Sequence, residues 1–173
     1  MIAMPSLARR VLLAALAASA ASCGATVEIP RFCITQSGLA IPGAPVAGSI
    51  TSPAFTVDVG GQIPLLRTGS TSTHVRVEDV TVTPVTGNPD LSGIQTASVT
   101  VQPATGAAVT VAGYQRSATA PTSLVLTGQD VDVEPLLVNG QATFQIALAG
   151  QPPAASWTAD VVTCLHAQSD VSP

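Results

Sequence analysis

The sequence predicts an all-β protein, a single-domain antiparallel β-sandwich of immunoglobulin-like architecture. Hydrophobic residues make up 46% of the chain and charged residues only 9%, and the apolar excess is Ala and Val rather than aromatics. β-branched side chains pack well on pleated sheets and lose rotamer freedom in helices. Short alternating runs recur between Gly and Pro, whereas no window after residue 23 keeps a helical spacing over three turns. An eight-stranded β-barrel is the alternative.

The first strands can be placed from the alternation of apolar and polar residues. Residues 35–53 are rich in Gly, Pro and Ser and indicate an ordered loop or a weak edge segment. Strands are expected over 54–59 and 73–85, where valines alternate with polar residues. The second run changes phase at Glu78-Asp79. An uninterrupted strand keeps a period of two, so this slip predicts a β-bulge or a kink.

The rest of the body continues the same pattern and brings the total to about eight or nine short strands. Two of these strands are expected to form a hairpin across residues 103–106 (PATG). Single helical turns are expected at 62–67 and at 135–139, the second opened by Pro135 and closed by Gly140. The further strands are expected at residues 94–102, 107–113, 123–127, 130–134, 142–148 and 156–167.

The first 22 residues have the parts of a secretory signal. Arg9-Arg10 precede the small and apolar stretch 11–21, and small residues then lead to Cys23. Eleven helical residues rise only about 17 Å, against a hydrocarbon core of about 30 Å. The stretch is therefore expected to direct export and not to span a membrane.

The tetrapeptide Ala20-Ala21-Ser22-Cys23 resembles the lipobox of bacterial lipoproteins, although Ala20 stands where leucine is usual. The resemblance implies that Cys23 is acylated and becomes the mature N-terminus. With Gly24 next, it also implies sorting to the outer membrane. An ordinary secretory signal, cleaved after Ala20, is the alternative and would give a secreted or periplasmic soluble protein. The expected organisation is a signal peptide (1–22), a lipidated N-terminus with a short tether (23–32), the sandwich domain (33–167) and a flexible tail (168–173).

The chain has three cysteines, which leaves one over for an exported protein. If Cys23 carries a lipid, Cys33 and Cys164 remain as a natural pair. An oxidising compartment permits a disulfide between them. Such a bridge would join the two ends of the body.

The charge of the body excludes one class of function. From Cys23 onward four arginines stand against ten carboxylates, a formal charge of −6, and the chain has no lysine. Nucleic-acid binding needs a basic stripe or patch, which is absent from the sequence. The expected partners are the membrane, reached through the N-terminal lipid, and an envelope protein, whereas the sequence leaves the oligomeric state open.

No catalytic motif is present, and the protein is not expected to be an enzyme or to hold a cofactor. There is no Gly-x-Ser-x-Gly turn, phosphate loop or His-Glu-x-x-His motif. A hydrolase could still be assembled from a serine with His74 and Asp79, but such residues occur together by chance in most chains of this length. A secreted hydrolase therefore stays a minor alternative.

Two residue groups are weak metal candidates. Asp130, Asp132 and Glu134 would line one face of a strand about 6.6 Å apart, which is too far for all three to bind one calcium ion. Cys164 and His166 could ligate a soft metal only if Cys164 were free of the disulfide. A solvated acidic face and a bystander histidine are the preferred interpretations.

The functional hypotheses follow from export and fold class. The first is a non-enzymatic cell-envelope lipoprotein with a structural, adhesion or assembly role near the membrane. The second is a periplasm-facing or surface module that binds or senses a ligand. Trp157, the single tryptophan, is expected in the core, with an exposed ligand platform as the alternative.

Overall fold

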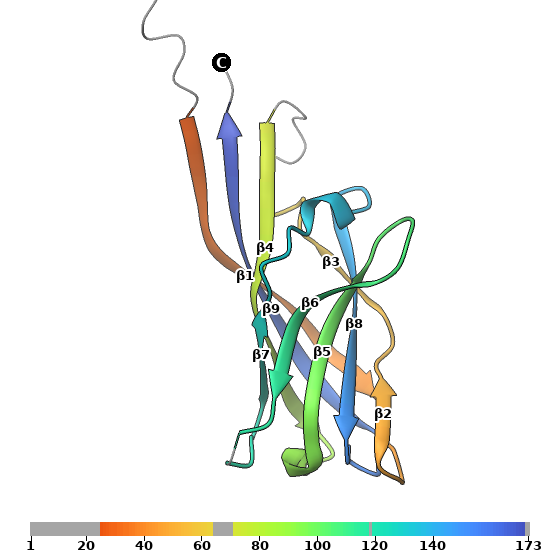
Figure 1. Cartoon of the computed structure of the whole chain (residues 1–173). Coiled ribbons are helices and arrows are strands. Elements are labelled where there is room, and N and C mark those ends of the chain that lie inside the picture. The colour runs from red at the N-terminus through yellow and green to blue at the C-terminus, as the bar shows by residue number, and fades with distance from the viewer. Residues whose placement is uncertain (1–24, 64–70, 118, 172–173) are drawn as a thin grey trace, which may run out of the picture.

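Nine strands and two short 3₁₀ helices make up the computed structural model, which describes residues 25–63, 71–117 and 119–171 (Figure 1). All strand pairs are antiparallel, so the predicted all-β antiparallel fold is confirmed. The strands are β1 (Ala25–Ile41), β2 (Gly48–Thr51), β3 (Phe55–Asp58), β4 (Thr71–Thr86), β5 (Ile94–Gln102), β6 (Val109–Gln115), β7 (Leu124–Gly128), β8 (Gln141–Gly150) and β9 (Trp157–Val171), and the helices are η2 (Leu91–Gly93) and η3 (Glu134–Leu136).

The strands form one hydrogen-bonded sheet in the order β1-β9-β4-β7-β6-β5-β8-β2, with β3 also paired to β8. This sheet curls, so that β1, β9, β4 and β7 make one layer and β6, β5, β8, β2 and β3 make the other (Figure 1). The layers join where β6 meets β7, through the pairs Ala112↔Gly128 and Gly113↔Thr127. The sandwich is therefore made by one curled sheet.

The core lies between the two layers and is built from alternate residues of each strand. In β4 the buried valines are Val75 and Val77 and then, after a change of phase, Val80 and Val82. The pairing of β4 with β9 has a register shift between Val77 and Asp79, which confirms the bulge predicted at this point. The bulge turns the second pair of valines back into the core.

The bounds of most predicted strands agree with the structure, and residues 94–102 agree at both ends. The first and last strands are longer than expected. Residues 25–32, expected as a tether, and residues 35–41, expected as an ordered loop or a weak edge segment, all belong to β1, which is an edge strand of the sheet, and β9 continues through Val171 into the expected tail. These segments pair with each other across the length of the chain, and local composition carries no signal of such pairing.

The two predicted helical turns have different outcomes. The turn at 62–67 lies mostly outside the described residues. Near 135–139 the 3₁₀ helix η3 begins at Glu134, with Pro135 in its first turn. Asn139 and Gly140 then take positive φ values of 54° and 78° in a turn closed between Val138 and Gln141. A helical turn at Pro135 is therefore confirmed, but η3 begins at Glu134 and ends at Leu136, so Gly140 belongs to the turn that follows and does not close the helix as predicted.

The ends of β1, β9 and β4 extend beyond the other strands as a three-stranded ribbon (Figure 1). Ala25 pairs with Val171, which pairs with Thr71 on its other side. The start of the described chain therefore lies at the tip of this ribbon.

Within the part of the chain that the structure describes, no helix is long and apolar enough to cross a membrane.

Candidate functional site

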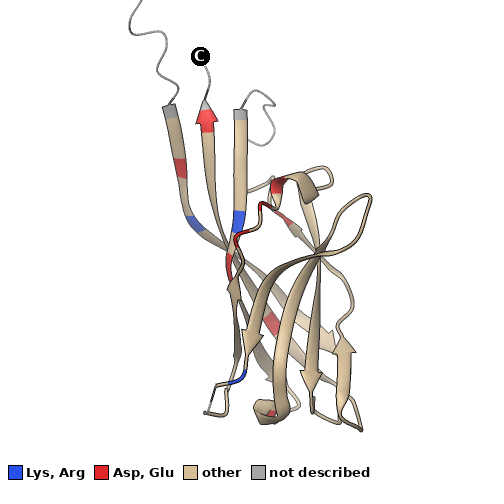
Figure 2. Cartoon of the chain, viewed as in Figure 1, with Lys and Arg blue, Asp and Glu red and all other residues tan. Residues whose placement is uncertain are grey.

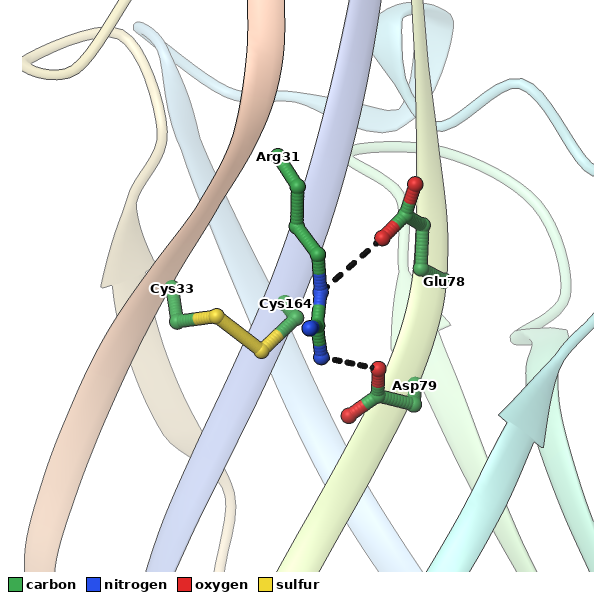
Figure 3. The surroundings of a disulfide bond; sticks show 5 residues. All are labelled: Arg31, Cys33, Glu78, Asp79 and Cys164. Carbon is green, nitrogen blue, oxygen red and sulfur yellow. Dashed lines mark hydrogen bonds and ion pairs between the residues drawn. A yellow bond between two sulfur atoms is a disulfide. The ribbon is translucent and has the colours of Figure 1, made fainter.

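The outer face of β1, β9 and β4 carries the disulfide, and Figure 3 shows its surroundings. Cys33 of β1 and Cys164 of β9 lie directly opposite each other in the register, with their Cα atoms 4.0 Å apart. Their sulfur atoms are bonded, which confirms the predicted pair. Cys33 is exposed, whereas Cys164 is 3% exposed. Because Cys164 is already bonded, it is no longer available with His166 as a metal ligand.

Arg31 links β1 to β4 beside the disulfide (Figure 3). Its Nε lies 3.0 Å from Glu78 Oε2, and its Nη2 lies 2.5 Å from Asp79 Oδ2. Arg31 and its partners lie at irregularities in their strands. Strand β1 shifts register between Ile29 and Phe32, and β4 has its bulge at Glu78. Because the side chains of Arg31 and Glu78 are 53% and 40% exposed, such pairs contribute at most about 1 kcal/mol.

His74 and Asp79, the histidine and the acid considered for a hydrolase triad, have different partners. Asp79 pairs with Arg31, while His74 Nδ1 lies 2.6 Å from Asp132 Oδ2. The described residues show no serine hydroxyl hydrogen bonded to His74. The sequence contains no signal for the Arg31 contact, because it depends on two bulges that lie far apart in the chain.

The acidic segment 130–134 is not a strand, which corrects the prediction made for it. Only Asp132 forms an isolated bridge, with Arg76 of β4, and the segment then turns into η3 at Glu134. Asp132 Oδ1 accepts hydrogen bonds from the backbone N–H groups of Val75 and Glu134, at 3.0 and 3.1 Å. A carboxylate that satisfies backbone donors in this way favours a turn over a continuing strand.

The three carboxylates of this segment do not converge on one point. Asp130 Oδ1 lies 2.5 Å from Arg76 Nη1, and Asp132 is occupied by His74 and two backbone N–H groups. Across the described ranges, no group of three or more His, Cys, Asp or Glu residues is placed to hold a metal ion. The carboxylates of Asp130 and Asp132 act instead as ion-pair and hydrogen-bond partners that hold the segment against β4.

Gly128 lets the chain pass from β7 into this segment. A Cβ atom at this position would lie 1.8 Å from the carbonyl oxygen of Val77 and 2.7 Å from that of Glu78. Real Cβ atoms do not approach backbone oxygen this closely, so glycine is required where β7 crosses the bulge of β4. The requirement for glycine at position 128 was not predicted from the sequence.

The environment of Asp132 lowers the pKa of its carboxyl group. Partial burial opposes ionisation, but hydrogen bonds from Val75 N–H, His74 and Glu134 N–H outweigh it, and the charge of a protonated His74 acts in the same direction. The pKa of Asp132 therefore lies below its ordinary value of 3.8.

We expect Asp132→Asn to lower the free energy of unfolding at pH 7 by about 1–2 kcal/mol, because the backbone N–H groups and His74 then meet a neutral acceptor in place of a charged one. The folded-state pKa is depressed, so this contribution is present above pH 3.8 and disappears as the pH falls through the folded-state pKa. Urea unfolding between neutral and acidic pH should therefore show a smaller loss of stability in the variant than in the wild type. Asp130→Asn is the control, because that side chain is 80% exposed and should change little. Equal pH profiles for wild type and Asp132→Asn would contradict this role.

A shallow polar pocket lies at the end of the molecule opposite the ribbon tip, between the loops before β5 and before β9. Asp90 forms one side, where its carboxylate accepts a 2.8 Å hydrogen bond from Ser92 N–H and caps η2. The hydrogen bonds from the Ser92 side chain and then from its backbone lower the pKa of Asp90. This pocket was not predicted from the sequence, although Asn88-Pro89-Asp90 is a recognisable turn sequence. It is lined by Asp90, Ser92, Gly93, Gln151, Pro152 and Pro153.

Trp157 is part of the core, as predicted, and is 3% exposed. Its indole therefore cannot serve as an exposed ligand platform. Phe55 and Phe144 stack in the same core, with ring centroids 5.8 Å apart. Cys23, the predicted lipidation site, lies outside the described residues.

Comparisons with known proteins give similarity of fold only. No known protein family and no curated protein matches the sequence. Among solved structures, the decameric BFDV capsid protein is similar at 11% identity and a TM-score of 0.45, over 84% of this chain and 99% of that one. Desmodium yellow mottle tymovirus is similar at 10% identity and a TM-score of 0.37, over 87% and 90%. CpGH89CBM32-5 from Clostridium perfringens is similar at 11% identity and a TM-score of 0.32, over 75% and 94%.

Proposed function

We propose that this chain is a non-enzymatic lipoprotein of the bacterial cell envelope, anchored in the outer membrane through a lipid on Cys23. Its role is structural, adhesive or in assembly close to the membrane surface. The proposal combines an export signal and a lipobox-like sequence with a compact β-sandwich whose described residues assemble no catalytic or metal centre. A sandwich fold supports many functions, so the site of anchoring carries more weight than the fold class.

The disulfide is the observation that carries the proposal. Cys33 and Cys164 are bonded to each other, so Cys23 is the one cysteine of the three that this bond does not use. A disulfide is also typical of proteins outside the reducing cytosol. The remaining cysteine is the one that follows Ala20-Ala21-Ser22, where a lipoprotein is modified.

The position of β1 supports anchoring close to the membrane. Strand β1 begins at Ala25, two residues after Cys23, and its first residue lies at the tip of the three-stranded ribbon (Figure 1). Two residues reach at most about 7 Å when fully extended. A lipid on Cys23 would hold the ribbon tip at the bilayer surface and direct the opposite end of the sandwich away from it.

We expect the intact mass of the wild-type protein to exceed that of its unmodified mature chain by the mass of the acyl groups, and we expect the protein to fractionate with membranes. Cys23→Ala should lose both properties, because no thiol remains to carry the lipid. Alkylation without reductant is the companion measurement and should label neither Cys33 nor Cys164. A wild-type protein that is soluble and unmodified at its N-terminus would refute the proposal, while the disulfide would be unaffected by that result.

A further inference from the structure

Four of the five strands in one layer of the sandwich are free of charge, and the fifth, β3, carries the exposed Asp58 where it pairs with Gln141 at the start of β8. Strands β2, β5, β6 and β8 contain no Asp, Glu, Lys, Arg or His. The other layer carries Arg31, Arg76, Glu78, Asp79 and Asp160, among others. In Figure 2 most of the coloured segments lie on β1, β9, β4 and the segment after β7, and others lie at η2 and in the connection after β6.

The outward residues of β2, β5, β6 and β8 form a surface that we call the uncharged face. Gly113, Ser98, Ala147 and Thr51 lie in one row across the four strands, because each is the register partner of the next. The pair Thr96 and Ala149 belongs to the adjacent row. Glycine, serine, alanine and threonine leave this face smooth and give it hydroxyl groups that both donate and accept hydrogen bonds.

Loss of charge over a whole face is a property of interface cores. Soluble protein surfaces carry about 25–35% charged residues, whereas the centres of protein interfaces are depleted of charge. Covering the uncharged face removes no ion from water, so the desolvation cost is confined to hydroxyl, amide and backbone groups. An interface on the other layer would require Asp79 and Asp160 to be desolvated or neutralised.

We propose that the uncharged face is a self-association surface, on which a second copy of this chain packs with the same face. The mature chain has a formal charge of −6, so two copies repel each other in every orientation that brings their charged layers together. Contact between the two uncharged faces keeps the charges of both copies apart. A two-fold contact also needs a self-complementary surface, and rows of hydroxyl groups provide one.

The dimensions of the face predict a weak dimer. The four strands contain 4, 9, 7 and 10 residues, and a spacing of about 4.8 Å with a rise of about 3.4 Å per residue gives about 500 Å² per copy, or about 1,000 Å² in total. This is at the lower limit of stable interfaces, where association is weak or transient. We therefore expect a dissociation constant in the micromolar range or above.

Sedimentation equilibrium of the exported Cys23→Ala chain tests the proposal without any contribution from a lipid. The weight-average mass should rise from monomer towards dimer as the concentration increases from about 10 µM to about 1 mM. The rise should persist or strengthen in about 0.5 M NaCl, because salt screens the repulsion and the contact contains no ion pair. A chain that stays monomeric over this range overturns the proposal.

Two matched substitutions in the same background locate the surface. Ala147→Arg places a charge at the centre of the uncharged face and should keep the chain monomeric. Thr81→Arg makes the same change of charge at the outer face of β4, next to the exposed Val125, and should leave association unchanged. Ser98→Arg replaces Ala147→Arg if the latter lacks the wild-type circular dichroism spectrum. Association that survives Ala147→Arg and Ser98→Arg, or that is lost only in Thr81→Arg, overturns the assignment of this face.

Discussion

Replacing Cys33 and Cys164 together by alanine is expected to lower the free energy of unfolding by about 2–5 kcal/mol. The two residues are 131 positions apart, so the bond restricts almost the whole body in the unfolded state. In the chain-entropy account a loop of this length contributes about 5 kcal/mol, near the upper end of the range. Urea unfolding of the double variant beside the oxidised wild type measures the difference.

The reduced wild type is the control for this measurement. Its midpoint should fall to that of the double variant, while the double variant should not respond to reductant. Single substitutions are avoided because they leave a thiol that could exchange with other cysteines. Equal midpoints for the oxidised wild type and the double variant would show that the bond contributes little to stability.

Substitution of Gly128 by alanine is expected to have the second large effect, a loss of about 3 kcal/mol or more. The added Cβ atom would lie 1.8 Å from the carbonyl oxygen of Val77, so β7 and β4 would have to separate at the bulge. That separation would also displace the segment that carries Asp132. Thermal and urea unfolding, with nuclear magnetic resonance of the His74 ring as a local probe, should report both changes.

Gly48→Ala is the matched control, since no atom lies within 4 Å of the Cβ position there. This substitution should change the free energy of unfolding by less than about 1 kcal/mol, and it can be stabilising because it restricts the unfolded chain. If Gly128→Ala were as stable as Gly48→Ala, the close approach of β7 to β4 would not limit this position.

The local part of the fold could be predicted from the sequence. Alternation places residues 94–102 in a strand with both ends correct, because each residue of β5 faces either the core or the outside. The change of phase at Glu78-Asp79 locates the bulge for the same reason. Both features depend only on neighbouring residues.

The parts that failed depend on partners far away in the chain. Residues 35–41 contain Gly38 and look like an ordered loop or a weak edge segment, and local composition did not show that they continue the long edge strand β1 and pair with β9, more than a hundred residues later. The segment 130–134 alternates like a strand, but the Asp132 carboxylate accepts hydrogen bonds from backbone N–H groups that in a continuous strand would bond to a neighbouring strand. Tertiary contacts decide both segments against their local pattern.

In the candidate site, too, the sequence predicted some features and not others. The disulfide could be predicted by counting cysteines once Cys23 was set aside. The partners of Arg31 could not, because they follow from bulges in two strands that are adjacent to β9 but not to each other. The uncharged face was present in the sequence as four strands without Asp, Glu, Lys, Arg or His, but only the order of strands shows that they are neighbours.

The position of the disulfide also determines how the protein would bear a mechanical load. A pull on the chain at Ala25 enters β1 at the ribbon tip and peels it from β9 one residue pair at a time. Peeling would stop at Cys33, where a covalent bond transfers the force to β9 in the centre of its layer. The force would therefore detach only residues 25–32 from β9. The sandwich beyond Cys33 would stay intact until the force was large enough to separate β1, β9 and β4 together from the other strands.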